Sequence, residues 1–452
     1  MTTMSDVEIT QWSACEQAAA IAAKQVSSRE LLDAFAARIE KHNPRVNAVV
    51  TLDLERGAHA SALADAATAR GESFGPLHGL PITIKDALNV AGMRSTGGAV
   101  ELTDHVPTRD ADAVAAVTSA GAFCFGKTNV PKWSGDIQTF NELFGTTNNP
   151  WDATKVPGGS SGGPAAAVAL GMTSFEIGTD IGGSIRVPSA YCGVVGHKPS
   201  YGLVPCGGYL DGPEGGLTEP DVNVHGPIAR SVDDLDLLLG IMAGPRPDRA
   251  QAWRVELPPS RHSRIADFRI AVWSDDPSCP VTASTREAIV SAAGTLDASV
   301  DFAARPAIDA NGASLLGMGL VSAAISSNLA HDEWLAKDRE RTRIRLAWAD
   351  FFRDHDVLLC PVIAREPFPH LQEGTFASRR IEIGGVDRPY TDLLWWTILI
   401  GMAYLPSTVV PIGRTADGLP IGVQIVGPYL EDRTCLAVAR ALETTLGPIV
   451  LP

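Results

Sequence analysis

The chain has 452 residues, of which 45% are hydrophobic and 20% charged, and its formal net charge is −15. This length suggests two or three domains or one large α/β sheet, in a composition typical of globular proteins. The acidic balance, with no run of basic residues, argues against nucleic acid as a partner. We see no signal segment and no apolar stretch of about 18 residues, so we expect a cytoplasmic protein with no membrane partner.

The cysteines and histidines show no pattern typical of a metal site or a disulfide framework. Seven cysteines are scattered along the chain without a C-x-x-C pair, and the ten histidines lack ligand spacing. We therefore expect no disulfides, no metal and a reducing environment.

The first 71 residues are predicted to form helices. Ser27 and Glu30 have the spacing of a capping box, and the apolar residues after them recur at helical intervals. We expect Asn43-Pro44 to end this helix and Gly71 to end the next one.

Residues 76–205 alternate between strand and helix signals, as an α/β core does. A buried strand is predicted over 80–84 with Lys85 at its end, and a helix, a glycine and a strand follow over 110–129. The stretch "KVPGGSSGGPAAAVALGM" predicts a glycine loop before a helix of small residues, and "TSFEIGTD" predicts another buried strand.

Residues 245–390 are the least regular part, with a Pro- and Arg-rich surface connection and then a helix and a strand in "IRLAWADFFRDHDVLLCPV". Residues 391–452 predict two strands joined by an Asp-Gly turn and a final helix.

Gly158–Gly162 fits the G-x-S-x-G pattern, in which Ser160 would be the nucleophile of an α/β-hydrolase-type esterase. That motif needs a buried strand before it, but the lead-in "NNPWDATKV" is polar and interrupted by proline. Such an enzyme would use a histidine such as His197 or His225. A nucleotide-binding loop is disfavoured, because such a loop has a lysine after its last glycine and this chain has Pro164 there.

A third interpretation joins Lys85 with two serines in glycine-rich segments, Ser160 and Ser184. A serine hydroxyl needs a base to become a nucleophile, and a lysine can be that base if burial lowers its pKa. Lys85 ends one of the most apolar segments of the chain, "LPITIK".

The motifs "GLPITIKD", "GGSSGG" and "GTDIGGSIRVPSAYCGVVGHKPS", together with "GPIARSVDDLDLLL" and "DGLPIGVQIVG", resemble the amidase signature family over nearly the whole chain outside about 245–340. The resemblance implies one large α/β domain, residues 1–452, with a mixed twisted β-sheet flanked by helices. It implies a triad of Ser184 as nucleophile, Ser160 after a cis peptide bond and Lys85. It also implies an oxyanion hole of backbone N–H groups, and it implies no cofactor. The residues of that oxyanion hole are Ile181, Gly182, Gly183 and Ser184.

Several positions qualify the resemblance. Pro164 replaces a common serine, Lys132 stands where relatives often have an acidic residue, and Asp180 and Arg186 could pair across the proposed nucleophile turn. Trp133, Trp395 and Trp396 lie in segments that border the substrate cleft in the family, as does the region 245–390. Packing in the core is the other explanation for the paired tryptophans.

The function expected from the resemblance is hydrolysis of small aryl or apolar amides, with esters and carbamates (urethanes) as plausible substrates. The alternatives are the glutaminase subunit of a tRNA-dependent amidotransferase, the esterase that uses Ser160 and a histidine, and a catalytically idle binding protein. The expected partner is the small-molecule substrate, with a homodimer left open.

Overall fold

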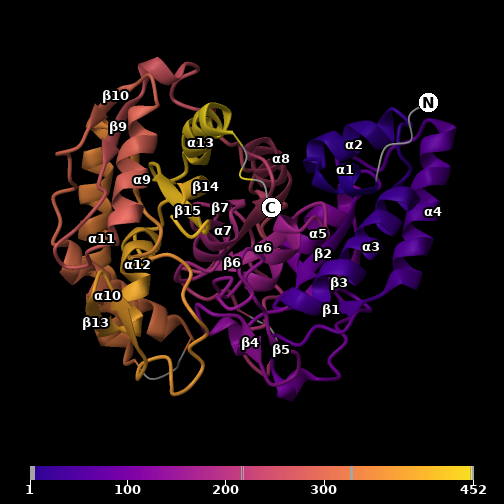
Figure 1. Cartoon of the computed structure of the whole chain (residues 1–452), viewed down its shortest axis with the longest axis horizontal. Helices are drawn as coiled ribbons and strands as arrows, with labels where there is room; N and C mark the ends of the chain where they lie inside the picture. Colours follow the sequence, from indigo (N-terminus) through magenta and orange to yellow (C-terminus); the bar gives the residue numbers. More distant parts are fainter. Residues whose placement is uncertain (1–5, 215, 217, 326–328, 448, 450–452) are drawn as a thin grey trace.

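The computed structural model describes residues 6–214, 216, 218–325, 329–447 and 449. An eight-stranded mixed sheet runs through the molecule, and a three-stranded sheet lies beside its last strand (Figure 1). In sheet order the large sheet contains β10 (Ser299–Asp301), β9 (Arg269–Val272), β11 (Val357–Pro361), β15 (Pro420–Val426), β14 (Ser407–Arg414), β7 (Val195–Lys198), β8 (Val224–Ala229) and β6 (Glu176–Asp180).

The small sheet confirms the predicted strand at Lys85 and adds a strand that the sequence did not reveal. Its order is β1 (Val49–Leu52), β3 (Phe123–Thr128) and β2 (Pro81–Lys85). β1 lies inside the segment predicted to be only helical, so that prediction was wrong for these four residues. Pairing with β3, more than 70 residues away in sequence, stabilises this short strand.

Helices cover both sheets. They are α1 (Asp6–Gln11), α2 (Ala14–Ala22), α3 (Ser28–Val46), α4 (Leu54–Arg70), α5 (Asp112–Ser119), α6 (Gly162–Ala169), α7 (Arg186–Cys192), α8 (Val232–Met242), α9 (Ala283–Gly294), α10 (Ala310–Ile325), α11 (His331–Asp354), α12 (Trp395–Gly401) and α13 (Asp432–Leu446). Two short hairpins complete the fold, β4 (Phe140–Asn141) with β5 (Gly145–Thr146) and β12 (Arg380–Ile383) with β13 (Val386–Pro389).

Helix boundaries follow local signals in most places. The Ser27–Glu30 capping box opens α3, and Gly71 ends α4 in the left-handed conformation, as predicted. Pro44, however, lies within α3, which continues to Val46 and ends at the left-handed Asn47. The expected end was therefore wrong by three residues.

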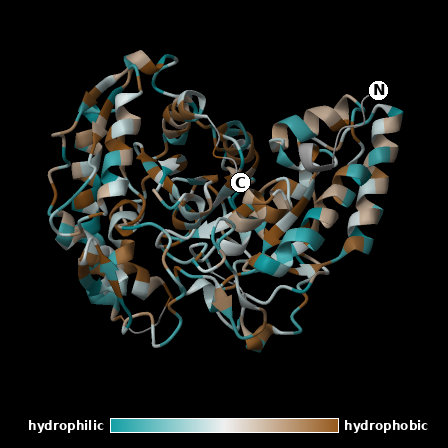
Figure 2. Cartoon of the chain, in the orientation of Figure 1, coloured by the Kyte–Doolittle hydropathy of each residue, from teal (hydrophilic) through white to brown (hydrophobic). Residues whose placement is uncertain are grey.

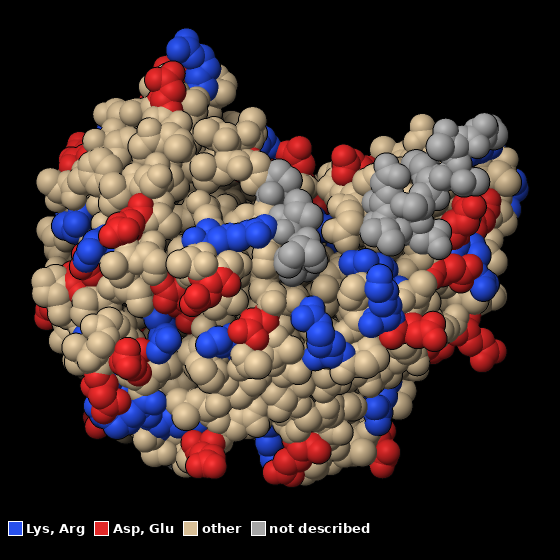
Figure 3. Space-filling model, viewed as in Figure 1, with Lys and Arg blue, Asp and Glu red and all other residues tan. Residues whose placement is uncertain are grey.

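The outer helices alternate hydrophilic and hydrophobic residues, as amphipathic helices do (Figure 2). The elements that carry the candidate site are different. β2, β6 and β7 are buried along their whole length, and so is most of α6 and α7. Acidic side chains are spread over the surface, whereas Lys and Arg gather near the middle of the face in Figure 3. Among the described residues, no helix combines the length and apolar character that a bilayer crossing requires.

Candidate active site

Lys85 lies at the centre of a buried cluster of hydroxyl groups. It is the last residue of β2, and its side chain is fully buried. Its Nζ donates hydrogen bonds to Ser160 Oγ (2.7 Å), Ser161 Oγ (2.9 Å) and Thr179 Oγ1 (2.7 Å). The structure thus brings together the predicted Lys85 and Ser160, and adds Ser161 and Thr179, which the sequence did not single out.

Burial holds the pKa of Lys85 well below its usual range, while the more distant charges of Asp180 and Glu176 act in the opposite direction. A neutral amine donates only two hydrogen bonds and accepts one. With three hydroxyl partners, neutral Lys85 can accept a proton from one of them and still donate to the other two.

Ser160 lies in the predicted glycine loop before α6. The Gly159–Ser160 peptide bond is cis, as the family resemblance implied. A Cβ on Gly159 would lie 2.6 Å from the backbone oxygen of Gln138, so only glycine fits there. Pro164 lies in the first turn of α6, where a missing N–H costs no helical hydrogen bond.

Ser184 lies in the turn between β6 and α7 and is 7% exposed, whereas Ser160 and Lys85 are fully buried. Its carbonyl oxygen accepts a hydrogen bond from the Ser161 N–H at 3.2 Å, which holds the two serine segments side by side. Within the described part of the chain, Lys85 bonds directly to Ser160 but not to Ser184. Hydrogen bonds of a catalytic relay are often long in a free enzyme and shorten once substrate binds.

One of the four predicted oxyanion donors is already engaged. The Gly183 N–H donates to Asp180 Oδ1 at 2.7 Å, because a φ of +129° turns this group toward the carboxylate. Gly183 is therefore not a free donor, which corrects the prediction. The N–H groups of Ile181, Gly182 and Ser184 have no hydrogen-bond acceptor among the described residues.

A buried ion pair holds this turn. Arg186 Nη2 lies 2.9 Å from Asp180 Oδ1, and both side chains are at most 1% exposed. Burial alone would raise the pKa of Asp180, but the Arg186 guanidinium lowers it to about 2. Because the carboxylate also accepts from the Ile185 N–H, Asp180 stays charged and fixes the shape of the turn.

Helix α12 packs against the same turn from far along the chain. Thr397 Oγ1 donates to the Gly182 carbonyl oxygen at 2.7 Å, across 215 residues. A Cβ on Gly182 would lie 3.4 Å from Ile398 Cδ1 and 3.7 Å from Leu394 Cδ1. Apolar side chains therefore border the turn, a contact that no local sequence signal could have predicted.

The three tryptophans divide into two groups. Trp133 is half-buried, adopts a left-handed backbone conformation and packs near Gly97. Trp395 and Trp396 are buried in the core against Trp273, and Trp396 Nε1 donates to the Cys279 carbonyl. The paired tryptophans therefore belong to the hydrophobic core.

The two candidate histidines lack the contact that a Ser–His pair requires. His197 is buried between Thr408 and Asp432, with ring nitrogens 2.8 and 3.1 Å from their oxygens. His225 is opposite Thr179 in the β6–β8 pairing, and neither of its ring nitrogens has a hydrogen-bond partner among the described residues. Burial and the charge of Lys85 lower the pKa of His225 to about 3, so it is neutral near pH 7.

Lys132 forms an exposed pair with Glu101 at 2.6 Å, on the surface of the molecule. Over the described ranges, no group of three or more His, Cys, Asp or Glu residues is arranged to hold a metal ion.

The chain is similar to known amidases over most of its length. A family model described as Amidase matches residues 30–303 and 315–436, which includes most of the 245–340 segment that we expected to fall outside the resemblance. The chain is 32% identical to a glutamyl-tRNA(Gln) amidotransferase subunit of Anaeromyxobacter sp. (strain K) and 32% identical to an acylamidase of Rhodococcus erythropolis. In both cases the match covers 97% of this chain and 96% of the relative. A bacterial aryl acylamidase structure superposes with a TM-score of 0.83 at 26% identity, over 97% of each chain.

Proposed function

This chain belongs to the amidase signature family of hydrolases that act on amide C–N bonds, and from this premise we propose that it cleaves small aryl or apolar amides through an acyl-enzyme on Ser184. One observation carries the proposal. A fully buried Lys85 bonds to Ser160, beside a glycine turn that presents Ser184 with unengaged N–H groups.

The proposed reaction begins with neutral Lys85. Ser184 Oγ attacks the carbonyl carbon while its proton passes to Ser160, whose own proton passes to Lys85 Nζ. The N–H groups of Ile181, Gly182 and Ser184 would bind the oxygen that becomes negative, and one such donor is typically worth about 3–4 kcal/mol in the transition state.

In the second half of the reaction the protons return by the same route to the departing amine. Water then attacks the ester on Ser184, and its proton passes along the relay to Lys85. When the bond between Ser184 Oγ and the carbonyl carbon breaks, this proton returns through Ser160 to Ser184 Oγ, and the carboxylic acid leaves. Lys85 ends each cycle as the neutral amine.

The surroundings of the turn support apolar substrates. Leu394 and Ile398 border Gly182 with apolar side chains. Backbone N–H donors recognise a carbonyl oxygen whatever is bound to its carbon. We therefore extend the proposal to aryl esters and, at lower rates, to aryl carbamates, in which two heteroatoms donate into the carbonyl.

A second candidate is the glutaminase subunit of a tRNA-dependent amidotransferase. It is favoured by the match to the glutamyl-tRNA(Gln) amidotransferase subunit, which equals the match to the acylamidase in identity and coverage.

The deciding experiment compares kcat/KM for an anilide, its carbamate analogue and glutamine with the isolated chain. We expect the anilide to be cleaved fastest, the carbamate more slowly and glutamine negligibly. Turnover of glutamine alone would refute the aryl-amide proposal and favour the amidotransferase subunit.

A further inference from the structure

A cavity lies at the C-terminal ends of α6 and α7, the two helices that follow Ser160 and Ser184. It has a volume of about 800 Å³, a size typical of ligand sites. Leu170 follows the last residue of α6, and Cys192 ends α7; both residues line the cavity. Since α6 has eight residues, its length of roughly 12 Å separates this cavity from Ser160 and Ser184.

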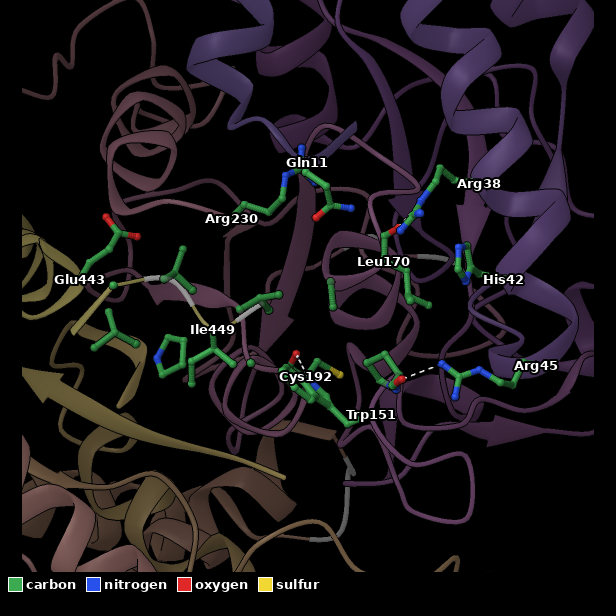
Figure 4. Close-up of a pocket in the computed structure, with 18 of the residues that line it drawn as sticks. Gln11, Arg38, His42, Arg45, Trp151, Leu170, Cys192, Arg230, Glu443 and Ile449 are labelled. Carbon is green, nitrogen blue, oxygen red and sulfur yellow. Dashed lines mark hydrogen bonds between the residues drawn. The ribbon is translucent and has the colours of Figure 1, made fainter. Parts of the chain in front are cut away.

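One side of the cavity is basic. Arg38, Lys41, His42 and Arg45 recur at helical spacing along α3 and all line it. Figure 4 shows Arg38, His42 and Arg45 on the same side of the cavity, with Glu443 on the opposite side. Lys and Arg also gather in the middle of this face in Figure 3, on a chain whose net charge is −15.

These cations lack carboxylate partners among the described residues. Arg38 donates to the Leu170 carbonyl oxygen through Nε (2.9 Å) and Nη2 (2.7 Å), and Arg45 Nη2 donates to the Pro150 carbonyl oxygen (2.7 Å). Lys41 is exposed, and within the described residues it has no hydrogen bond or ion pair. Burial lowers the pKa of Arg38, and burial together with Arg38, Lys41 and Arg45 lowers that of His42.

The negative charge around the cavity is smaller than the three positive charges of Arg38, Lys41 and Arg45. Each helix C-terminus contributes roughly half a negative charge. Glu443 is the acidic residue that lines the cavity, and burial raises its pKa to about 7, so it is only partly ionised near neutral pH. Arg230, which also lines the cavity, donates to backbone carbonyls and has Asp234 and Glu16 nearby. An excess of more than one positive charge remains.

Apart from Gln11, the remaining side chains of the lining are apolar. Leu170, Val194, Val195, Val410 and Pro411 form this part with Trp151, whose Nε1 donates to the Cys192 carbonyl oxygen. An inorganic anion has no apolar part that could contact this surface.

We propose that this cavity is a second binding site, separate from the catalytic site, for an organic carboxylate with an apolar body. The carboxylate would bind to Lys41 and Arg45, with His42 Nε2, which is buried and without a hydrogen-bond partner in the described structure, as a further polar contact. The acid released by amide hydrolysis belongs to this chemical class. The proposal does not depend on which residue is the nucleophile.

The test is a calorimetric and thermal-shift titration of the full chain with phenylacetate. The pocket variant is Lys41→Gln/Arg45→Gln, and the matched control is Arg343→Gln/Arg353→Gln, which removes the same charge from side chains that are 70% and 80% exposed on α11. We expect saturable binding that weakens at high salt, at least tenfold weaker binding in the pocket variant and unchanged binding in the control. Anilide turnover should be unchanged in both variants.

Three results would overturn the proposal. Undiminished binding in the pocket variant would place phenylacetate elsewhere, for instance in the catalytic site. The absence of saturable binding to the wild-type chain would show that the cavity does not hold this carboxylate. Equal binding of inorganic phosphate would show that the apolar lining plays no part and would refute the assignment to an organic anion.

Discussion

Two lysines are buried on neighbouring strands but have different partners. Lys127 on β3 donates to the Leu88 carbonyl oxygen and to Ser95 Oγ, and its Nζ lies 4.0 Å from Asp86. Lys85 on β2 has three hydroxyl partners and, among the described residues, no ion pair with a carboxylate. Burial lowers the pKa of both lysines; the charge of the neighbouring Asp86 opposes this shift for Lys127, and the charges of Asp180 and Glu176, which make no ion pair with Lys85 among the described residues, oppose it for Lys85. Of these two lysines, Lys85 is therefore the one suited to act as a neutral base for the serines.

The pH dependence of kcat/KM tests this assignment. The working base is the neutral amine, so activity should be low below the pKa of Lys85, rise with pH through it and reach a plateau well below pH 10.5. We expect Lys85→Met to reduce kcat/KM by at least about a hundredfold at every pH, since general-base catalysis typically contributes a factor of 10² to 10⁴.

The controls for this profile are His225→Gln and Lys127→Met. Both should retain the acid limb, because His225 stays neutral above about pH 3 and Lys127 donates to Ser95 and Leu88 and, among the described residues, not to Ser160 or Ser184. Loss of the limb in His225→Gln would instead indicate a Ser–His mechanism.

At the scale of elements, the turn between β6 and α7 is fixed from two sides. The Asp180–Arg186 pair binds it from within, and Thr397 on α12 binds the Gly182 carbonyl from outside. Arg186 Nη1 also donates to the Thr397 carbonyl oxygen at 2.8 Å, so the pair and the helix form one network. The turn is consequently rigid before any substrate arrives.

The two glycines of the turn should tolerate alanine very differently. Gly183 has φ of +129°, and a Cβ there would lie 2.8 Å from Thr397 Oγ1, whereas a Cβ on Gly182 meets nothing closer than 3.4 Å. Unfavourable backbone conformations cost about 1–3 kcal/mol. We expect Gly183→Ala to lower the free energy of unfolding by at least that amount and to reduce kcat/KM about a hundredfold.

Gly182→Ala is the matched control, because it adds the same methyl group one residue earlier. Its free energy of unfolding should stay within about 0.5 kcal/mol of the wild-type value, since the added methyl group makes only ordinary van der Waals contacts. If the two variants had the same free energy of unfolding and the same kcat/KM, this account of the turn would be contradicted.

At the scale of the whole molecule, sequence reasoning succeeded where the determinants are local. The capping box at Ser27, the buried strand that ends in Lys85 and the turn at Gly418 between β14 and β15 are all observed. The single α/β domain with a mixed sheet is confirmed as well. The division of the chain into segments such as 76–205 and 245–390 stays a prediction.

Contacts between distant segments could not be predicted from one sequence. The pairing of β1 with β3, the Thr397–Gly182 hydrogen bond and the burial of Trp395 and Trp396 depend on how elements far apart in the chain pack together. The engagement of the Gly183 N–H by Asp180 depends on a backbone angle that residue type alone does not specify.

The central claim, that Ser184 is the nucleophile and Ser160 the relay, is tested most directly by labelling with a fluorophosphonate and mapping the modified peptide. We expect the label on Ser184, no label in Ser184→Ala, slower labelling in Ser160→Ala and near-normal labelling in Ser161→Ala, whose hydroxyl also contacts Lys85. A label on Ser160, or undiminished labelling of Ser184→Ala, would contradict the account.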